Sequence, residues 1–575
     1  MKLRYLLILA IAAYSIVVAF RNALRQPGTT NFAQKIAEKK KFSIRCSPAY
    51  LPSADDDIPL LSGWGNYTWT ISSNSDSARI FFNQGINMYY AFHIIEARAS
   101  FDKAAKFDPN CAMAWWGKAL AYGPNINDFG YQRPSEAFAS AAKANALKAN
   151  ASPLERALIE AIAARYVADS AANQDILNAL YRDKMKAVYQ AFPKDENVST
   201  LYADALMLMH PWNLYDHDFK ARPWTAEIVA VIKHALRLNP KQPGANHYYI
   251  HAVEASAKPG AALASASFLA TAMPDVSHLT HMPSHIYIRT GAYDKGITVN
   301  DQGLAGYNKY HNYFAATEEN IALYVLHNVH MKINCAQMAG NYGIASASSK
   351  ELQQLLPAFY LQIPGALGNY VQYLYRTDIF TWIRFGKWKE ILNEPVGDTL
   401  SFTPVLQHFA RGMAFANTNK ITDAEKELAI MQQKMAEPSL KEPLAPFNSV
   451  YDAALIGENI LAGSIAENKQ DLAKAISIFK KAVQFEDNLV YNEPRDWLLP
   501  ARQYLGAALI KGGQYKKAVA VFTRDLQINP GNGWSLTGLQ TCYRQLKNAT
   551  ALPPVQRQLK AAWSIKDIPV DAAVF

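Results

Sequence analysis

The chain has 575 residues, half of them hydrophobic, so it exceeds one ordinary core and must form several domains or a repeat array. This hydrophobic content argues against a disordered chain. The formal net charge of +10 comes from basic residues spread along the chain, without a dense Lys/Arg block, and this argues against nucleic-acid binding.

The N-terminal segment has the pattern of a secretory signal. Lys2 and Arg4 precede an apolar run from Tyr5 to Phe20, which is short for a membrane-spanning helix. We expect residues 1–29 to be a cleaved signal peptide or a retained N-terminal membrane anchor. Both alternatives predict export to the periplasm or another extracytoplasmic space, with attachment to the inner membrane if the segment is retained. Residues 30–75 contain Pro, Gly, Ser and three consecutive Asp, and we expect an irregular N-terminal extension there.

A 34-residue internal period is the main structural signal. With Gly506 at position 8, the frame places Tyr515 at 17, Ala518 at 20, Phe522 at 24 and Pro530 at 32. These are the positions that define tetratricopeptide repeats. The small residues let two helices approach closely, the aromatic ring fills the gap between them, and the proline ends the second helix.

The same frame fits near the start of the chain, with Gly85, Phe101 and Pro109 in the corresponding positions. We therefore predict an all-α, tetratricopeptide-like α-solenoid, a right-handed superhelix of helical hairpins. Histidine-bearing N-terminal and central repeats are expected over residues 76–345, and C-terminal tetratricopeptide-like repeats over 346–575. The first helix of each hairpin lines the concave face of such a solenoid, where a peptide or protein partner would bind.

Two histidine pairs repeat in register in the middle of the chain. His247 and His251 are one helical turn apart, as are His281 and His285, and 34 residues separate each histidine from its counterpart. Equivalent positions of neighbouring repeats stack side by side, so these imidazoles should converge. Four such nitrogens can bind a divalent transition metal, with Zn or Cu most favoured.

Further residues join this candidate site. His330 occupies the same repeat position as His247, while His278 and His327 share another; we predict His278 and His330 as additional metal ligands and His327 as a binding residue. Glu254 follows His251 on a similar helix face. It could be a metal ligand, a partner that orients an imidazole, or a catalytic general base.

The repeat frame places further polar residues on or near the same helix face. Arg289, one turn after His285, could hold an anionic group. Asp204, His210 and Tyr248 are predicted binding residues on the same face, and Glu318 and Glu319 could reach it from an insertion. His93 falls in the turn of the first repeat and is expected to be ordinary surface.

Three blocks carry a family resemblance: FFNQGINMYYAFHIIEARASFDKAAKFDPNCAMAWWGKALAYGPN, YADALMLMHPWNLYD, and PGANHYYIHAVEAS followed by HLTHMPSHIYIRTGAY. With a fourth, weaker block, LHNVHMKINCAQMAGNY, they resemble a group of bacterial tetratricopeptide-repeat proteins with the same histidine motifs, over about residues 80–345. The resemblance implies the repeat fold and its boundaries, and it leaves the chemistry open. Where the group has Asn-His-Asp-Glu in the first turn, this chain has Phe92-His93-Ile94-Ile95-Glu96, so no role for His93 is implied.

The sequence leaves three functions open. The first is an exported repeat protein with a metal-binding site that, in an enzyme, would perform metal-activated water or oxygen chemistry on a small-molecule substrate. The second is a scaffold that binds a protein or peptide, with histidines that only pack and hydrogen-bond between helices. The third is a periplasmic metal carrier.

Overall fold

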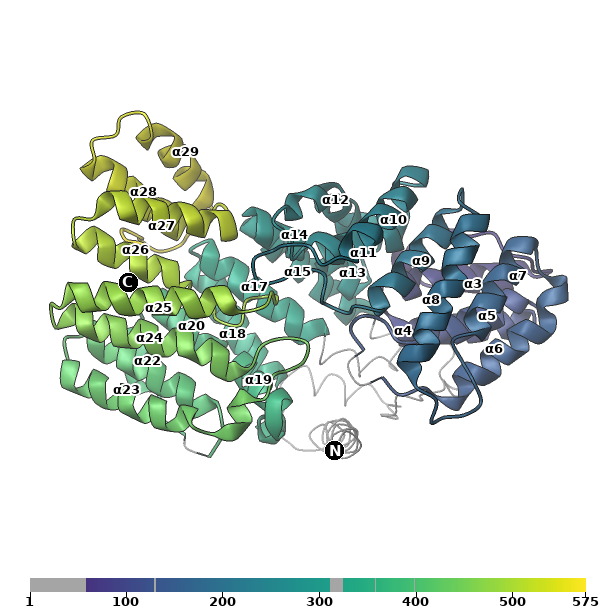
Figure 1. Ribbon diagram of the computed structural model, residues 1–575, viewed down its shortest axis with the longest axis horizontal. Coiled ribbons are helices and arrows are strands. Elements are labelled where there is room, and N and C mark those ends of the chain that lie inside the picture. Colours follow the sequence, from purple (N-terminus) through teal and green to yellow (C-terminus); the bar gives the residue numbers. More distant parts are fainter. Residues whose placement is uncertain (1–57, 129–130, 311–323, 357, 398) are drawn as a thin grey trace.

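The computed structural model describes residues 58–128, 131–310, 324–356, 358–397 and 399–575. The regular secondary structure of these ranges is helical, and the one extended pairing in them is an isolated bridge between Tyr215 and Ala221. Successive antiparallel helices stack into a curved array (Figure 1). The predicted all-α, tetratricopeptide-like solenoid is therefore confirmed.

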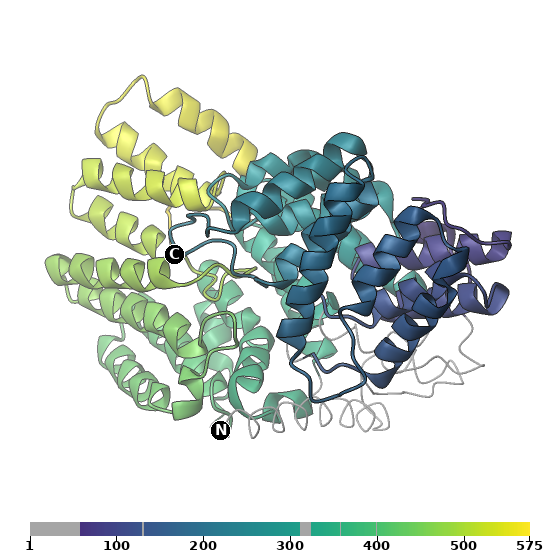
Figure 2. The same cartoon turned by 45° about the vertical axis from the view of Figure 1, so that its right-hand side comes forward.

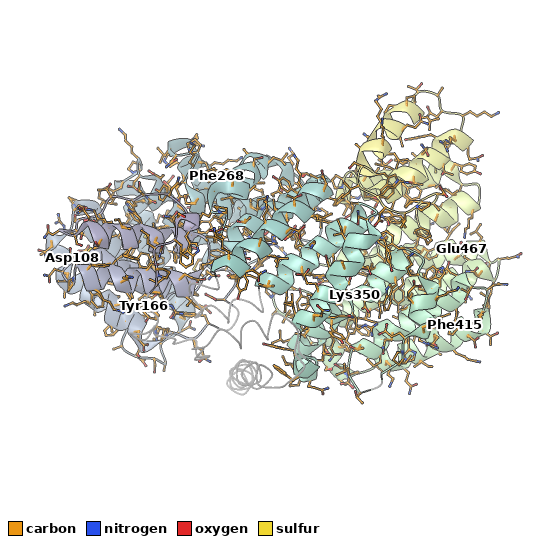
Figure 3. The ribbon with its side chains drawn as sticks, turned by 180° about the vertical axis from the view of Figure 1, so that it is seen from behind. Asp108, Tyr166, Phe268, Lys350, Phe415 and Glu467 are labelled. Carbon is orange, nitrogen blue, oxygen red and sulfur yellow. The ribbon has the colours of Figure 1, made fainter. Side chains whose placement is uncertain are left out.

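The helices fall into three consecutive stretches. The first contains α3 (Asp76–Tyr90), α4 (Ile94–Phe107), α5 (Ala112–Ala121), α6 (Ser135–Leu147), α7 (Pro153–Ala163), α8 (Gln174–Ala191), α9 (Glu196–Leu208) and α10 (Thr225–Leu238). The central stretch contains α11 (Pro243–Val253), α12 (Leu263–Ala272), α13 (Ser277–His281), α14 (Pro283–Thr290), α15 (Tyr293–Tyr310), α17 (Leu326–Met338) and α18 (Tyr342–Leu355). The last contains α19 (Gly365–Tyr375), α20 (Thr377–Arg384), α21 (Trp388–Asn393), α22 (Thr403–Asn417), α23 (Ile421–Met435), α24 (Val450–Asn468), α25 (Leu472–Asn488), α26 (Ala501–Lys511), α27 (Tyr515–Ile528), α28 (Gly533–Gln545) and α29 (Leu552–Ala562). Seen from behind, Phe268 on α12, Lys350 on α18 and Phe415 on α22 mark the course of the array (Figure 3).

The repeat frame corresponds to specific packing. The ring at position 24 lies directly on the glycine at position 8 of the same hairpin, so a Cβ on Gly506 would lie 2.3 Å from the Phe522 ring. On the other side of that ring, a Cβ on Gly538 would also lie at 2.3 Å. Position 8 therefore requires a glycine because the two helices are too close for a larger side chain. The same contact recurs between Gly85 and Phe101.

Gly506→Val is therefore expected to destabilise the protein by about 1–3 kcal/mol, because the added methyl groups overpack a filled contact. Gly397→Val is the matched control, since nothing lies within 4 Å of a Cβ at that position. The midpoints of urea unfolding compare the two. Equal midpoints would show that the Phe522 contact does not fix the distance between α26 and α27.

The predicted segment boundaries agree with the described helices at some points and differ from them at others. The expected signal or anchor at 1–29 lies outside the described residues. Within residues 58–75 the chain is irregular apart from the 3-10 turn Ser62–Trp64, yet Trp64, Trp69 and Ile71 are buried. The boundary drawn at 345/346 falls inside α18. Among the described helices, none combines the length and hydrophobicity needed to cross a bilayer.

The C-terminal repeats close back onto the central ones (Figure 2). The Arg289 guanidinium donates to the Ile528 carbonyl (3.0 Å), and Tyr293 donates to the Pro530 carbonyl (2.9 Å). Trp534 donates to the Gln337 carbonyl at 3.0 Å. These contacts place the end of α27 and the start of α28 beside the central helices α14, α15 and α17.

Candidate metal centre

The histidine pairs are carried by α11 and by the short helices α13 and α14. Pro243 occupies the first turn of α11, where its missing N–H leaves no bond unmade. The neighbouring Gly244 admits the Tyr90 ring, since a Cβ there would lie 2.4 Å from it. Pro283 interrupts what the repeat predicts as one helix, and it separates α13 from α14. His281 and His285 nevertheless stay in contact across this break.

The imidazole Nε2 atoms point toward one another. His247 Nε2 lies 3.1 Å from His251 Nε2, and His281 Nε2 lies 2.8 Å from His285 Nε2. His327, from α17, places its Nε2 3.3 Å from that of His285. Nitrogen ligands about 2.0–2.1 Å from a tetrahedral metal ion lie about 3.3 Å apart, so these separations are close to those of a coordination shell.

The Nδ1 atoms are held by acceptors. His247 Nδ1 donates to the Tyr90 carbonyl (2.7 Å), and His251 Nδ1 donates to Glu254 (2.9 Å). His285 Nδ1 donates to the other oxygen of Glu254 (2.6 Å) and also contacts Glu493. Because the same carboxylate receives both N–H groups, Glu254 links the two histidine pairs.

His281 is fixed in the same way. Its Nδ1 donates to the Asn300 side-chain oxygen at 2.7 Å, and the Asn300 amide nitrogen donates to the Gly296 carbonyl, which orients the oxygen toward the imidazole. With Nδ1 carrying the proton, the neutral imidazole presents a lone pair at Nε2. Such partners on the second nitrogen are the usual means of orienting metal-ligating histidines.

Two three-histidine groups result, each with ligand atoms within 4.8 Å of one another. The first histidine group is His247, His251 and His278. The second histidine group is His281, His285 and His327. A third set, Glu254, His285 and Glu493, overlaps the second.

The side chains of the cluster differ in the direction in which their pKa values are shifted. Burial, followed by neighbouring imidazoles, lowers the pKa well below its usual value for His247, His278, His281 and His327. His285 differs: burial lowers its pKa, but Glu493 and Glu254 outweigh this and raise the pKa to about 10. Burial would raise the pKa of Glu254, yet His285 and His251 hold it at about 2. Burial raises the pKa of Glu493 to about 7.

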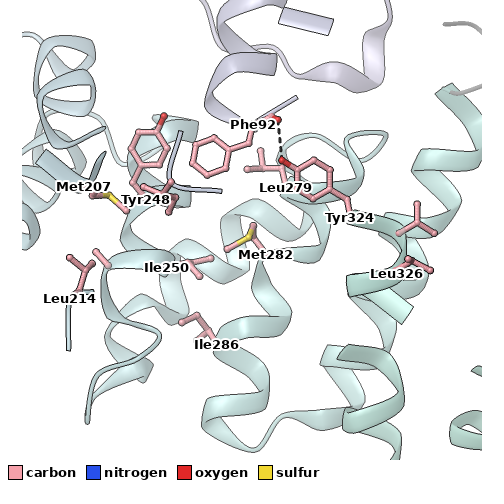
Figure 4. Close-up of a cluster of buried hydrophobic side chains, with 14 of the residues drawn as sticks. Phe92, Met207, Leu214, Tyr248, Ile250, Leu279, Met282, Ile286, Tyr324 and Leu326 are labelled. Carbon is pink, nitrogen blue, oxygen red and sulfur yellow. Dashed lines mark hydrogen bonds between the residues drawn. The ribbon is translucent and has the colours of Figure 1, made fainter. Parts of the chain in front are cut away.

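Two aromatic residues with unusual backbones enclose the first histidine group. Phe92 (φ 59°) and Trp212 (φ 58°) lie in the left-handed region, which bulky residues rarely adopt. The Phe92 ring lies 4.5 Å from His247, and the Trp212 ring lies 5.4 Å from His251. The Tyr324 hydroxyl donates to the Phe92 carbonyl, and Tyr324 lies on the side of Phe92 away from Tyr248 (Figure 4). Strain of this kind concentrates at functional sites.

Several predicted residues lie apart from these groups. His330, although in register with His247, belongs to neither group and packs against Tyr373. His210 stacks on Trp224 with 3.9 Å between ring centroids, and Asp204 accepts a hydrogen bond from Tyr89.

Two predicted binding residues have contacts of other kinds. Tyr248 is buried core beside Phe92. The Arg289 guanidinium donates to the carbonyls of Glu254, Ser256 and Ile528, so its N–H groups bind main chain.

The expectation for His93 was wrong. This residue is buried, its Nδ1 contacts Glu96 (2.9 Å), and its Nε2 accepts the backbone N–H of His278 at 3.4 Å. The turn between α3 and α4 therefore lies against α13 and is not solvated surface. Glu318 and Glu319 lie outside the described residues.

Sequence reasoning missed Glu493 and Asn300. Asn300 is one of many polar residues on α15, and Glu493 lies in an irregular segment between α25 and α26 with no repeat signal. Glu493 also lines a cavity of about 30 Å³ together with Arg289 and Tyr491, which is room for one or two water molecules.

One family model of a helical repeat matches part of the chain. Residues 459–488, in α24 and α25, match the family model of the tetratricopeptide repeat. The human IFIT1 dimer with m7Gppp-AAAA is 13% identical with a TM-score of 0.29, covering 86% of this chain and 91% of that chain. Yeast Tom70 is 10% identical with a TM-score of 0.27, covering 85% and 93%. Cut9–Hcn1 of the APC/C is 12% identical with a TM-score of 0.28, covering 86% and 95%. Comparison with curated proteins found no match.

Proposed function

We propose that the protein binds a transition metal ion at the second histidine group, in the middle of its helical solenoid. The supporting observation is the convergence of three Nε2 atoms. His281 and His285 each have their Nδ1 proton committed to an acceptor, so their Nε2 atoms face each other and His327 as potential ligands. Lone pairs that face each other at such distances repel unless a cation, either a proton or a metal ion, lies between them.

Zn or Cu is the favoured ion, because three imidazoles form the ligand set. Three protein ligands leave a fourth position for water or a small-molecule substrate, as in catalytic zinc sites. A bound ion would supply Lewis acidity and activate water there. Glu254 then acts as a positioning residue rather than a general base, since both its oxygens accept imidazole N–H groups.

The sequence supports an extracytoplasmic setting for the site. The N-terminal signal pattern supports export, with the site in the periplasm or another extracytoplasmic space. The histidine motifs support kinship with the bacterial tetratricopeptide-repeat group that they resemble. A metal carrier without catalysis would have the same ligands but no room for a substrate beside the ion.

The tetratricopeptide fold itself favours a second candidate function, a scaffold that grips a protein or peptide partner in its concave groove. This function does not need the histidines. Its partner affinity would therefore survive His281→Ala, whereas a metal site would lose its ion.

Elemental analysis of the protein, purified without chelators or a nickel column, tests the proposal. The parent is expected to hold bound Zn or Cu, and His281→Ala/His327→Ala to lose about one ion per chain while staying folded. His330→Ala is the matched control, since it removes a buried imidazole outside both groups. A parent that holds no ion, even after addition of Zn or Cu, would contradict the proposal and favour the scaffold.

A further inference from the structure

We infer that the first histidine group holds a second metal ion, adjacent to the first, so that the solenoid carries an ion pair. This inference rests on the proposed function for the first ion. It has its own observations, which concern His247, His251 and His278.

His247 and His251 bring their Nε2 atoms together, while both of their Nδ1 atoms donate elsewhere. The Tyr90 carbonyl takes the Nδ1 proton of His247, and Glu254 takes that of His251, so two lone pairs face each other at 3.1 Å. His247 has no carboxylate partner, and a metal ion would remove the repulsion.

His278 supplies the independent observation. It is buried, and neither of its ring nitrogens has a hydrogen-bond partner within the described structure. Leaving a buried polar group without a partner destabilises the folded protein, so such a group calls for a ligand. The His278 ring lies 5.1 Å from that of His247, with a nitrogen within 4.8 Å of the nitrogens of His247 and His251.

The position of His278 is also fixed from outside. Its backbone N–H donates to His93, and its ring packs between Phe92 (5.9 Å) and Tyr324 (4.5 Å). His330 provides the contrast, because it too lacks partners at both nitrogens but has no ligand-type side chains grouped with it. His278 therefore differs from His330 in having two other imidazoles, those of the first histidine group, close enough to share a metal ion.

The two ions would be neighbours. The ring centroids of His251 and His285 are 5.9 Å apart, and those of His278 and His281 are 6.0 Å apart. These distances between the groups are no longer than the 6.2 Å between His251 and His278 inside the first histidine group. Glu254 joins the groups by accepting from His251 and His285. Two Cu(II) ions in such positions would couple magnetically.

Copper loading of the full chain tests the inference. After addition of Cu(II) and removal of excess, the parent is expected to retain about two ions per chain, one for each group. The spin count by electron paramagnetic resonance should fall well below the copper count. His278→Phe should retain about one ion with a full spin, as should His327→Phe, while His330→Phe should match the parent. His247→Gln provides a second variant of the first group if His278→Phe does not fold.

The outcomes separate the two claims. About one copper ion in both the parent and His278→Phe would overturn the second ion and leave the proposed function standing. Two ions with two full, independent spins would overturn the pairing. No retained copper in the parent would overturn the inference together with the proposed function.

Discussion

Replacing Glu254 with Gln is expected to weaken metal binding by about 10–100-fold, the usual effect of losing a residue that orients a ligating histidine. The carboxylate accepts from His251 and from His285, one N–H on each oxygen. An amide can accept from one of them only, because its nitrogen is a donor. One imidazole must then turn or change its protonated nitrogen, and its Nε2 no longer faces the ion.

Competition with a chromophoric chelator measures this loss. Glu427→Gln is the matched control, because Glu427 also pairs with a buried histidine, His408, but lies on α23 away from the cluster. Its metal affinity should equal that of the parent. Equal affinity for Glu254→Gln would show that the ligand orientation does not depend on this carboxylate.

Arg289→Ala is expected to destabilise the protein by about 3–5 kcal/mol. The buried guanidinium donates to three carbonyls, those of Glu254, Ser256 and Ile528. Truncation leaves these acceptors without a donor and removes a direct bond between α14 and the end of α27.

Chemical unfolding measures this effect. Arg237→Ala removes an exposed arginine from α10 and should change stability by no more than about 0.5 kcal/mol. If Arg289→Ala unfolded at the same denaturant concentration as Arg237→Ala, the carbonyl contacts would be solvated in the native protein and the C-terminal repeats would not depend on them.

Much of the central arrangement could be predicted from sequence because it depends on local rules. One helical turn places His247 beside His251, and one repeat period places His285 beside His251. The repeat frame also placed His330 with these histidines, but His330 belongs to neither histidine group. The insertion before α17 interrupts the 34-residue period, so the repeat position of His330 does not give its place in space. On α17 it is His327, one turn earlier, that reaches His285.

Longer-range features could not be predicted. Glu493 reaches His285 only because small rotations between repeats add up until the α25–α26 segment meets α14, and no local pattern encodes that sum. Burial of His93 likewise depends on the left-handed turn at Phe92, a conformation that sequence preferences argue against.

The closure of the C-terminal repeats onto the central ones changes how this solenoid should fold. In a linear repeat array each unit contacts only its neighbours, so folding can begin anywhere and an end can fray independently. Here Asn341 donates to the Ile565 carbonyl and Trp534 to that of Gln337, across gaps of 224 and 197 residues. Forming these contacts requires closing very long loops, which slows folding. The last repeats and the central ones are thereby coupled into one cooperative unit, and the end of this chain should exchange its amide protons as slowly as its middle.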